Sequence, residues 1–120
     1  MAEVLAYVDD IFFQAKIMET AKHVGVAVRS FTTPDALLDE IAKQAPNLVI
    51  VDLNARSNPL EAIRRVRESC FGLPVVAFLS HVEVELAERA RAAGCAEVMP
   101  RSKFTQNLAT ILAQGKSQSS

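Results

Sequence analysis

Three aspartates, Asp9, Asp10 and Asp52, each follow an apolar run and are the residues best placed to do chemistry. The run 48–51 consists of four consecutive apolar residues, a pattern typical of a strand buried on both faces. Residues 3–8 repeat the arrangement near the N-terminus. Because ligands bind at the carboxyl ends of strands in an open parallel sheet, we expect the three carboxylates to meet in one crevice.

Carboxylates this close to one another repel, which raises their pKa values or retains a proton, and a divalent cation removes the conflict. Mg²⁺ takes one or two carboxylates directly and keeps coordination positions for phosphoryl oxygens. An aspartate beside such an ion can attack a phosphorus atom and become an aspartyl phosphate. Arg101 begins the loop after the last predicted strand, where its charge can pair with that phosphoryl group.

Each acid also has a simpler interpretation when it is taken alone. Asp10 is suited to cap the helix that follows it, Asp9 to lie in a solvated loop, and Asp52 to be a polar residue at a strand end. We favour the shared acidic site because all three acids fall at the same predicted crevice. His81 is expected to be an exposed loop residue rather than a metal ligand, since no second histidine or cysteine accompanies it.

Five predicted strands alternate with five predicted helices and would position these residues. The strands are expected at 3–8, 26–31, 47–52, 75–79 and 97–99. The helices are expected after Asp10, after Thr33 and after Asn58, then from Val82 to Ala93 and from Phe104 through Leu112, with Gly25 and Gly94 ending the first and the fourth. This alternation favours an α/β, doubly wound, five-stranded parallel sheet.

The uninterrupted apolar strands are expected at the centre of the sheet and the second and fifth strands at its edges, which gives the order 2-1-3-4-5. The switch point then falls between the first and third strands, beside Asp9, Asp10 and Asp52. Residues 1–114 are predicted to form one domain, and residues 115–120 a polar, frayed tail.

Composition and charge narrow the possible classes of protein. A chain of 120 residues that is 50% hydrophobic and carries a net charge of -1 has the balance of one globular domain. It shows no basic stripe for nucleic acid, and no apolar run approaches the roughly 20 residues that cross a membrane. Cys70 and Cys95 form neither a zinc motif nor a disulfide framework, so we expect a cytoplasmic protein.

Four stretches carry a resemblance to a known family. They are Val8-Asp9-Asp10, Leu48-Val49-Ile50-Val51-Asp52, Leu73-Pro74-Val75-Val76-Ala77 and Ala92-Ala93-Gly94-Cys95. In these stretches the chain resembles the receiver domain of two-component response regulators, of the chemotaxis-regulator type, over about residues 3–114. The resemblance implies the flavodoxin-like receiver fold and a role in phosphorelay signalling rather than an enzymatic one.

The resemblance also implies individual roles. Asp52 would be the phosphoacceptor, and Asp10, Asp52 and the backbone carbonyl of Asn54 would bind Mg²⁺ directly. Asp9 would reach the ion through water. The partners would be a histidine kinase or phosphotransfer protein upstream and another protein downstream, with neither nucleic acid nor a membrane involved.

The chain departs from the family pattern at the positions that read out phosphorylation. Leu79 stands where a threonine or serine is expected, with Ser80 one residue away as a shifted hydroxyl. Val98 replaces the aromatic switch residue, and Arg101-Ser102 replaces a lysine and a proline. Arginine keeps the charge but presents a planar fork instead of a compact ammonium. We therefore expect metal binding to be retained and the readout to be weakened.

The leading hypothesis is an atypical receiver domain that acts through protein–protein interaction, with Asp52 as the candidate phosphoacceptor. One alternative is a pseudo-receiver that docks or forms homodimers through its last two helices without phosphorylation. Another is a small Mg²⁺-dependent phosphohydrolase with Asp52 as nucleophile. The enzyme is disfavoured because the sheet and its helices use up the chain and leave no cap to enclose a substrate.

Overall fold

A computed structural model of the chain describes residues 2–80 and 83–117. Its centre is a five-stranded parallel sheet in the order β2-β1-β3-β4-β5, as the sequence predicted. The strands are β1 (Val4–Tyr7), β2 (Val28–Phe31), β3 (Leu48–Asp52), β4 (Val75–Leu79) and β5 (Glu97–Pro100). Every residue of β1, β3 and β4 is buried, whereas β2 and β5 are partly exposed edges.

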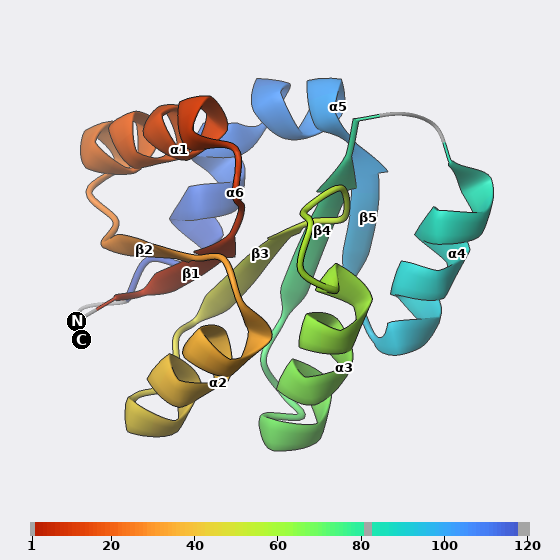
Figure 1. Ribbon diagram of the computed structural model, residues 1–120. Coiled ribbons are helices and arrows are strands. Elements are labelled where there is room, and N and C mark those ends of the chain that lie inside the picture. The colour runs from red at the N-terminus through yellow and green to blue at the C-terminus, as the bar shows by residue number, and fades with distance from the viewer. Residues whose placement is uncertain (1, 81–82, 118–120) are drawn as a thin grey trace.

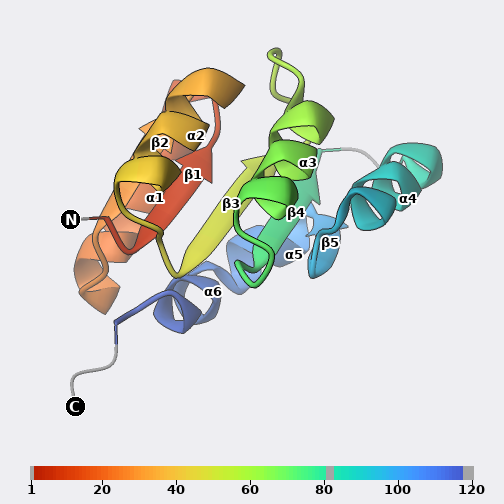
Figure 2. The same ribbon diagram turned by 90° about the horizontal axis from the view of Figure 1, so that it is seen from below.

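Helices cover both faces of the sheet (Figure 1). One layer contains α1 (Ile11–Val24), α5 (Arg101–Gln106) and α6 (Leu108–Gln114), and the other contains α2 (Pro34–Lys43), α3 (Pro59–Ser69) and α4 (Val84–Ala93). Figure 2 shows the second layer side by side across the sheet. A doubly wound sheet of this kind exposes the carboxyl ends of its strands along one edge, which is where ligands bind.

Capping residues begin or end several helices at the positions that the sequence analysis predicted. Gly25 follows α1 in the left-handed conformation, with φ 82°, and Gly94 follows α4 with φ 118°. A residue without a Cβ adopts these dihedrals without strain. The Thr33 side chain accepts a hydrogen bond from the backbone N–H of Ala36, and Pro34 occupies the first position of α2.

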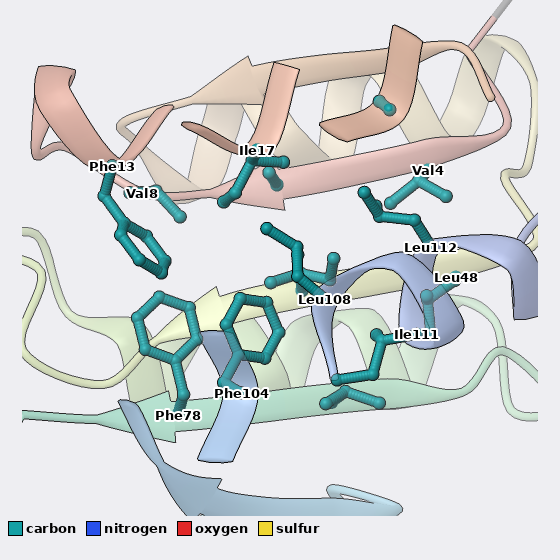
Figure 3. Packing of buried hydrophobic residues seen from close by; sticks show 14 of the residues in the cluster. Val4, Val8, Phe13, Ile17, Leu48, Phe78, Phe104, Leu108, Ile111 and Leu112 are labelled. Atoms are coloured by element: carbon teal, nitrogen blue, oxygen red, sulfur yellow. The ribbon is translucent and has the colours of Figure 1, made fainter. Parts of the chain in front are cut away.

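Two hydrophobic cores lie on opposite faces of the sheet. The core under α1, α5 and α6 is centred on three aromatic rings, Phe13, Phe78 and Phe104, which Figure 3 shows meeting between helices and sheet. The ring centroids of Phe78 and Phe104 lie 4.4 Å apart and the rings are stacked. The other core, under α2, α3 and α4, is mainly aliphatic and includes Leu79 and, at its margin, Val98.

The C-terminal region differs from the prediction in three ways. The helix α5 begins at Arg101, where a loop was predicted, and not at Phe104. The single last helix is divided into α5 and α6 at Asn107, whose side-chain amide donates to the Lys103 carbonyl at 2.9 Å. An asparagine that bonds its own preceding turn competes with the helical hydrogen bonds. The predicted tail is also held as far as Ser117, because Gly115 is buried and its carbonyl accepts from the Asn47 amide at 3.0 Å.

The loop between β4 and α4 includes His81 and Val82, which lie outside the described residues, so the interpretation of His81 and the predicted start of the fourth helix at Val82 stay untested there. The described part of that helix begins at Val84. Within residues 2–80 and 83–117, no helix is long and apolar enough to cross a membrane.

Candidate functional site

The acidic residues lie at the carboxyl ends of two adjacent central strands. Asp52 is the last residue of β3, and Asp9 and Asp10 follow β1 directly before α1. The strands β1 and β3 are paired along their length, with Tyr7 opposite Val51. The predicted switch point therefore exists, and the three acids stand beside it.

Asp52 is the most enclosed of the acids, with only 4% of its surface exposed. Its Oδ1 accepts a hydrogen bond from the backbone N–H of Asn54 at 2.9 Å. Burial raises the pKa of Asp52, although the Asn54 N–H and the charge of Arg101 oppose the rise; the negative charges of Asp9 and Asp10 add to it. The pKa of Asp52 therefore responds to the charges of Asp9 and Asp10, and the shared acidic site stays a prediction.

Asp10 performs two roles at once. Its Oδ1 accepts from the backbone N–H groups of Phe12 at 3.0 Å and Phe13 at 3.2 Å, which caps the N-terminus of α1. Its Oδ2 lies 3.2 Å from an Nη of Arg101. The Phe13 N–H is the main reason that the pKa of Asp10 is lowered, with Arg101 and Phe12 contributing. The simple helix-cap interpretation is correct, and it coexists with a place in the site.

Arg101 is the first residue of α5 and lies on aromatic rings rather than in open solvent. Its guanidinium carbon is 4.2 Å from the ring centroid of Phe13 and 5.7 Å from that of Phe78. Cation–π contact of this kind holds an arginine in one orientation. The Nε–H of Arg101 is buried and has no hydrogen-bond partner among the residues that the structure describes.

The loop after β3 is fastened to β1. Asp9 accepts from the backbone N–H of Arg56 at 2.9 Å, and the buried Tyr7 hydroxyl donates to the carbonyl of Ser57. Sequence reasoning missed Tyr7, although a lone tyrosine in a buried strand signals a hydroxyl that needs a partner. These two bonds tie the loop after β3 to β1 and to the segment that follows β1.

The same loop is fastened to β4 by an asparagine. The Asn54 Oδ1 accepts from the backbone N–H of Ser80 at 2.6 Å and from its hydroxyl at 2.9 Å. Sequence reasoning used only the backbone carbonyl of Asn54 and missed this side-chain role. Leu79 points into the aliphatic core, where it lines an apolar groove with Val98 and Val84 between α4 and β5.

The residues present fit Mg²⁺ in chemical type but are not arranged as a finished metal site. Hard carboxylate and carbonyl oxygens are the donors that Mg²⁺ prefers, and Asp9, Asp10, Asp52 and Asn54 supply them. Among residues 2–80 and 83–117, no three acidic, histidine or cysteine side chains are grouped closely enough to hold a metal ion. The Oδ2 of Asp10 instead faces Arg101. The metal assignment stays a prediction.

No family model matches the sequence, and no curated protein matches it either. Solved structures do match. The receiver domain of NtrX from Brucella abortus superposes with a TM-score of 0.80 at 21% identity, covering 93% of this chain and 96% of that one. The chemotaxis response regulator CheY4 of Vibrio cholerae gives 0.81 at 20% identity, covering 97% and 99%.

A CheY-like response regulator receiver domain protein from Methanospirillum hungatei JF-1 gives a TM-score of 0.79 at 14% identity, covering 96% of each chain. At these identities the likeness establishes the fold. The chain has the fold of response regulator receiver domains, as the resemblance in its sequence implied.

Proposed function

We propose that this chain is a receiver domain that works in phosphorelay signalling, with Asp52 as its phosphoacceptor. The observation that carries the proposal is the position of Asp52 at the carboxyl end of a central strand in a receiver fold, with the charges of Asp9, Asp10 and Arg101 within electrostatic reach. Ligands of open α/β sheets bind at that edge, so the site has the location as well as the residue type.

In the proposed reaction a carboxylate oxygen of Asp52 attacks the phosphorus of a phosphohistidine on the partner. The new P–O bond gives an aspartyl phosphate, the P–N bond breaks, and the imidazole leaves with the bonding electron pair and takes up a proton. Arg101 contributes positive charge that offsets the developing negative charge on the phosphoryl oxygens. Asn54 keeps Asp52 oriented through its backbone N–H.

Asp10, Asp52 and the Asn54 carbonyl would hold Mg²⁺, with Asp9 bonded through water. A bound ion would neutralise the clustered carboxylates and the incoming phosphoryl oxygens. Ser80 is the shifted hydroxyl of the site, and it is currently bonded to the Asn54 side chain. A phosphoryl group on Asp52 would therefore compete with Asn54 for that hydroxyl.

For the upstream partner, a histidine kinase or phosphotransfer protein, two exposed apolar residues beside Asp10 would offer a contact point. Ile11 is 69% exposed and Phe12 is 83% exposed, directly after Asp10 at the start of α1. Large apolar side chains on a surface beside a reactive group are typical of an interaction site. Their burial on docking would bring the partner's phosphohistidine to Asp52.

Intact mass after treatment with acetyl phosphate and Mg²⁺ tests the proposal. We expect the wild type to gain one phosphoryl group and Asp52→Ala to gain none. Asp39→Ala is the matched control, because Asp39 is an exposed acid on α2 outside the crevice. Equal labelling of Asp52→Ala and wild type would contradict the role of Asp52, and turnover of a phosphomonoester would favour the phosphohydrolase alternative.

One observation favours the pseudo-receiver as a second candidate function. Asp52 is only 4% exposed, so a phosphodonor reaches its carboxylate only if the residues around it move. A pseudo-receiver would dock through its α4, β5 and α5 surface in the same way whether or not Asp52 is intact. Unlabelled wild-type protein in the mass experiment, with unchanged binding of Asp52→Ala to a captured partner, would support this function.

A further inference from the structure

Phe71 is a large aromatic residue that is 80% exposed in the loop between α3 and β4, at the opposite end of the sheet from Asp52. Its ring is nevertheless held in place by Arg67. The guanidinium carbon of Arg67 lies 4.9 Å from the ring centroid, and an Nη of Arg67 donates to the Phe71 carbonyl at 2.7 Å. A ring that is exposed but fixed loses little conformational freedom when a partner covers it, which is typical of an interface anchor.

A groove between α2 and α3 adjoins Phe71. Figure 2 shows these two helices side by side on one face of the sheet. The groove has a volume of about 540 Å³, and its lining includes Leu38, Ile41 and Ala42 of α2 together with Cys70, the residue before Phe71. Roughly 150 Å³ is enough for a benzene ring. The groove is therefore large enough to receive a phenylalanine side chain, and the projecting ring and the groove belong to one surface.

The groove and the surroundings of the ring carry charges of opposite sign. Asp39 on α2 and Glu68 on α3 both line the groove, and neither forms an ion pair among residues 2–80 and 83–117. The cation Arg65, which also lines it, is bonded to Asp35 at 2.8 Å. Beside the ring, Arg67 bonds a backbone carbonyl and has no carboxylate partner in the described part of the chain. The groove therefore keeps an excess of negative charge and the anchor an excess of positive charge, which makes them complementary.

We propose that two copies of this chain associate through this surface, with Phe71 of each copy inserted in the α2–α3 groove of the other. A two-fold contact requires a self-complementary patch, and a ring beside a groove of opposite charge has that property. Arg67 of one copy then approaches Asp39 and Glu68 of the other. This dimer uses the end of the sheet away from Asp52, so it forms independently of phosphorylation, and it does not involve the last two helices.

Sedimentation equilibrium of the full chain tests the proposal. A small patch gives a weak complex, so the protein is measured from roughly 20 µM to 1 mM, where we expect a reversible dimer in the wild type. Phe71→Ser removes the anchor, and Ala42→Glu adds bulk and negative charge to the groove. Each should raise the dissociation constant at least roughly tenfold. Both residues are exposed, so both variants should fold.

The matched control is Val84→Ser. Val84 is an exposed apolar residue like Phe71, with 63% of its surface exposed, but it lies on α4 outside the proposed contact. This variant should dimerise as tightly as the wild type. A weakened dimer in Val84→Ser with an unchanged one in Phe71→Ser would place the interface between α4 and β5 and overturn the inference.

A mixture of the two variants separates insertion into the groove from stacking of the two rings on each other. Phe71→Ser copies keep an intact groove, and Ala42→Glu copies keep an intact ring. Each variant alone therefore lacks both contacts of the dimer, whereas the mixed pair regains one of them. The equimolar mixture should associate more tightly than either variant alone. A mixture that associates no more tightly than its components overturns the inference, because the ring then does not enter the groove.

Amide NMR spectra of the wild type at both ends of the concentration range locate the contact without any variant. The concentration-dependent shifts should fall on residues 38–45 and 65–71, and shifts confined to α4, β5 and α5 overturn the inference. A wild type that stays monomeric over the whole range overturns it as well. Labelling of Asp52 by acetyl phosphate does not depend on this contact, so the proposed phosphoacceptor role is decided separately.

Discussion

At the edge formed by the carboxyl ends of the strands, the β1–β3 side and the β4–β5 side differ in the interactions that their residues make. On the β1–β3 side, Asp9, Asp10 and Asp52 all accept hydrogen bonds, and Arg101 lies between Asp10 and two aromatic rings. On the β4–β5 side, Leu79 and Val98 line an apolar groove, as part of the surface between α4 and β5. Charged residues therefore lie on one side of this sheet edge and an apolar groove lies on the other, so the two sides can be tested separately.

The largest effect expected is on stability. Phe78→Ala should lower the free energy of unfolding by about 3–5 kcal/mol, because Phe78 is fully buried and stacks on Phe104 while supporting Arg101. Val98→Ala on the other side should cost only about 1 kcal/mol, since Val98 is half-buried beside an open groove. Urea unfolding followed by circular dichroism measures both. Equal costs would show that the two sides are packed equally well.

The next effect concerns the charge of Asp52. Burial raises the pKa of Asp52 above its ordinary value of 3.8, so the folded state favours the neutral carboxyl. The stability associated with that proton is fully present below about pH 3.8 and is lost as the pH rises through the raised pKa. In Mg²⁺-free buffer at pH 7, Asp52→Asn should therefore be more stable than the wild type by about 1 kcal/mol.

Free energies of unfolding at a series of pH values check this prediction. The gap between Asp52→Asn and wild type should close in acid, and the exposed control Asp39→Asn should show no such gap. A less stable Asp52→Asn at pH 7 would mean that the Asn54 N–H and Arg101 outweigh the burial of Asp52. The ionisation of Asp10 affects the free energy of unfolding in the opposite direction. The pKa of Asp10 is lowered in the folded state, so its charge stabilises the fold above about pH 3.8 and that stability is lost as the pH falls.

The fold could be predicted because apolar runs indicate which faces are buried and helix-capping residues indicate where helices begin and end. The unbroken apolar runs of β1, β3 and β4 indicated central strands, and Gly25 and Thr33 marked helix boundaries that the structure confirms. The break at Asn107 was missed, because a continuous apolar face from Phe104 to Leu112 fits one helix as well as two. The pattern of apolar residues indicates which side of a helix is buried. It does not indicate where an asparagine side chain hydrogen-bonds the backbone of its own helix.

The sequence placed Asp9, Asp10 and Asp52 at the carboxyl ends of β1 and β3, but it did not predict which side chains bond one another. Asp10 and Arg101 are 91 positions apart, and nothing local indicates that the guanidinium stacks on Phe13 and bonds the acid that caps α1. Asn54 was expected to contribute a backbone carbonyl, whereas its side chain bonds Ser80. Such contacts depend on the packed geometry of distant segments, which the order of residue types does not encode.

The loop after β3 offers a smaller test of the same difference, because hydrogen bonds connect it both to β1 and to Ser80 after β4. Tyr7→Phe should lower the free energy of unfolding by about 1 kcal/mol, since it leaves the Ser57 carbonyl without its buried donor. Ser80→Ala should cost less than about 0.5 kcal/mol, because Ser80 is exposed and water replaces its hydroxyl. Thermal melts compare the two. A larger cost for Ser80→Ala would place the main attachment of the loop on the β4 side.

The smallest effect expected is the response of α4, α5 and α6 to phosphorylation. In receivers the response requires a hydroxyl at the end of the fourth strand that follows the phosphoryl group and an aromatic in the fifth that follows the hydroxyl. Here those positions are Leu79, which is buried among aliphatic side chains, and Val98. A ligand shifts an equilibrium only by its differential contacts with the two states, so a phosphoryl group on Asp52 should move this surface little.

Amide NMR spectra with and without beryllofluoride, an aspartyl phosphate mimic, measure that response. Large shifts should be confined to the neighbourhood of Asp10, Asp52 and Arg101. Ser80 provides the remaining route, because its release from Asn54 toward the mimic would pull on the start of the segment that leads to α4. Ser80→Ala is then the control: if large shifts spread across α4 and α5 in the wild type and vanish in Ser80→Ala, the hydroxyl of Ser80 is the relay, and the response of this surface runs through a shifted residue.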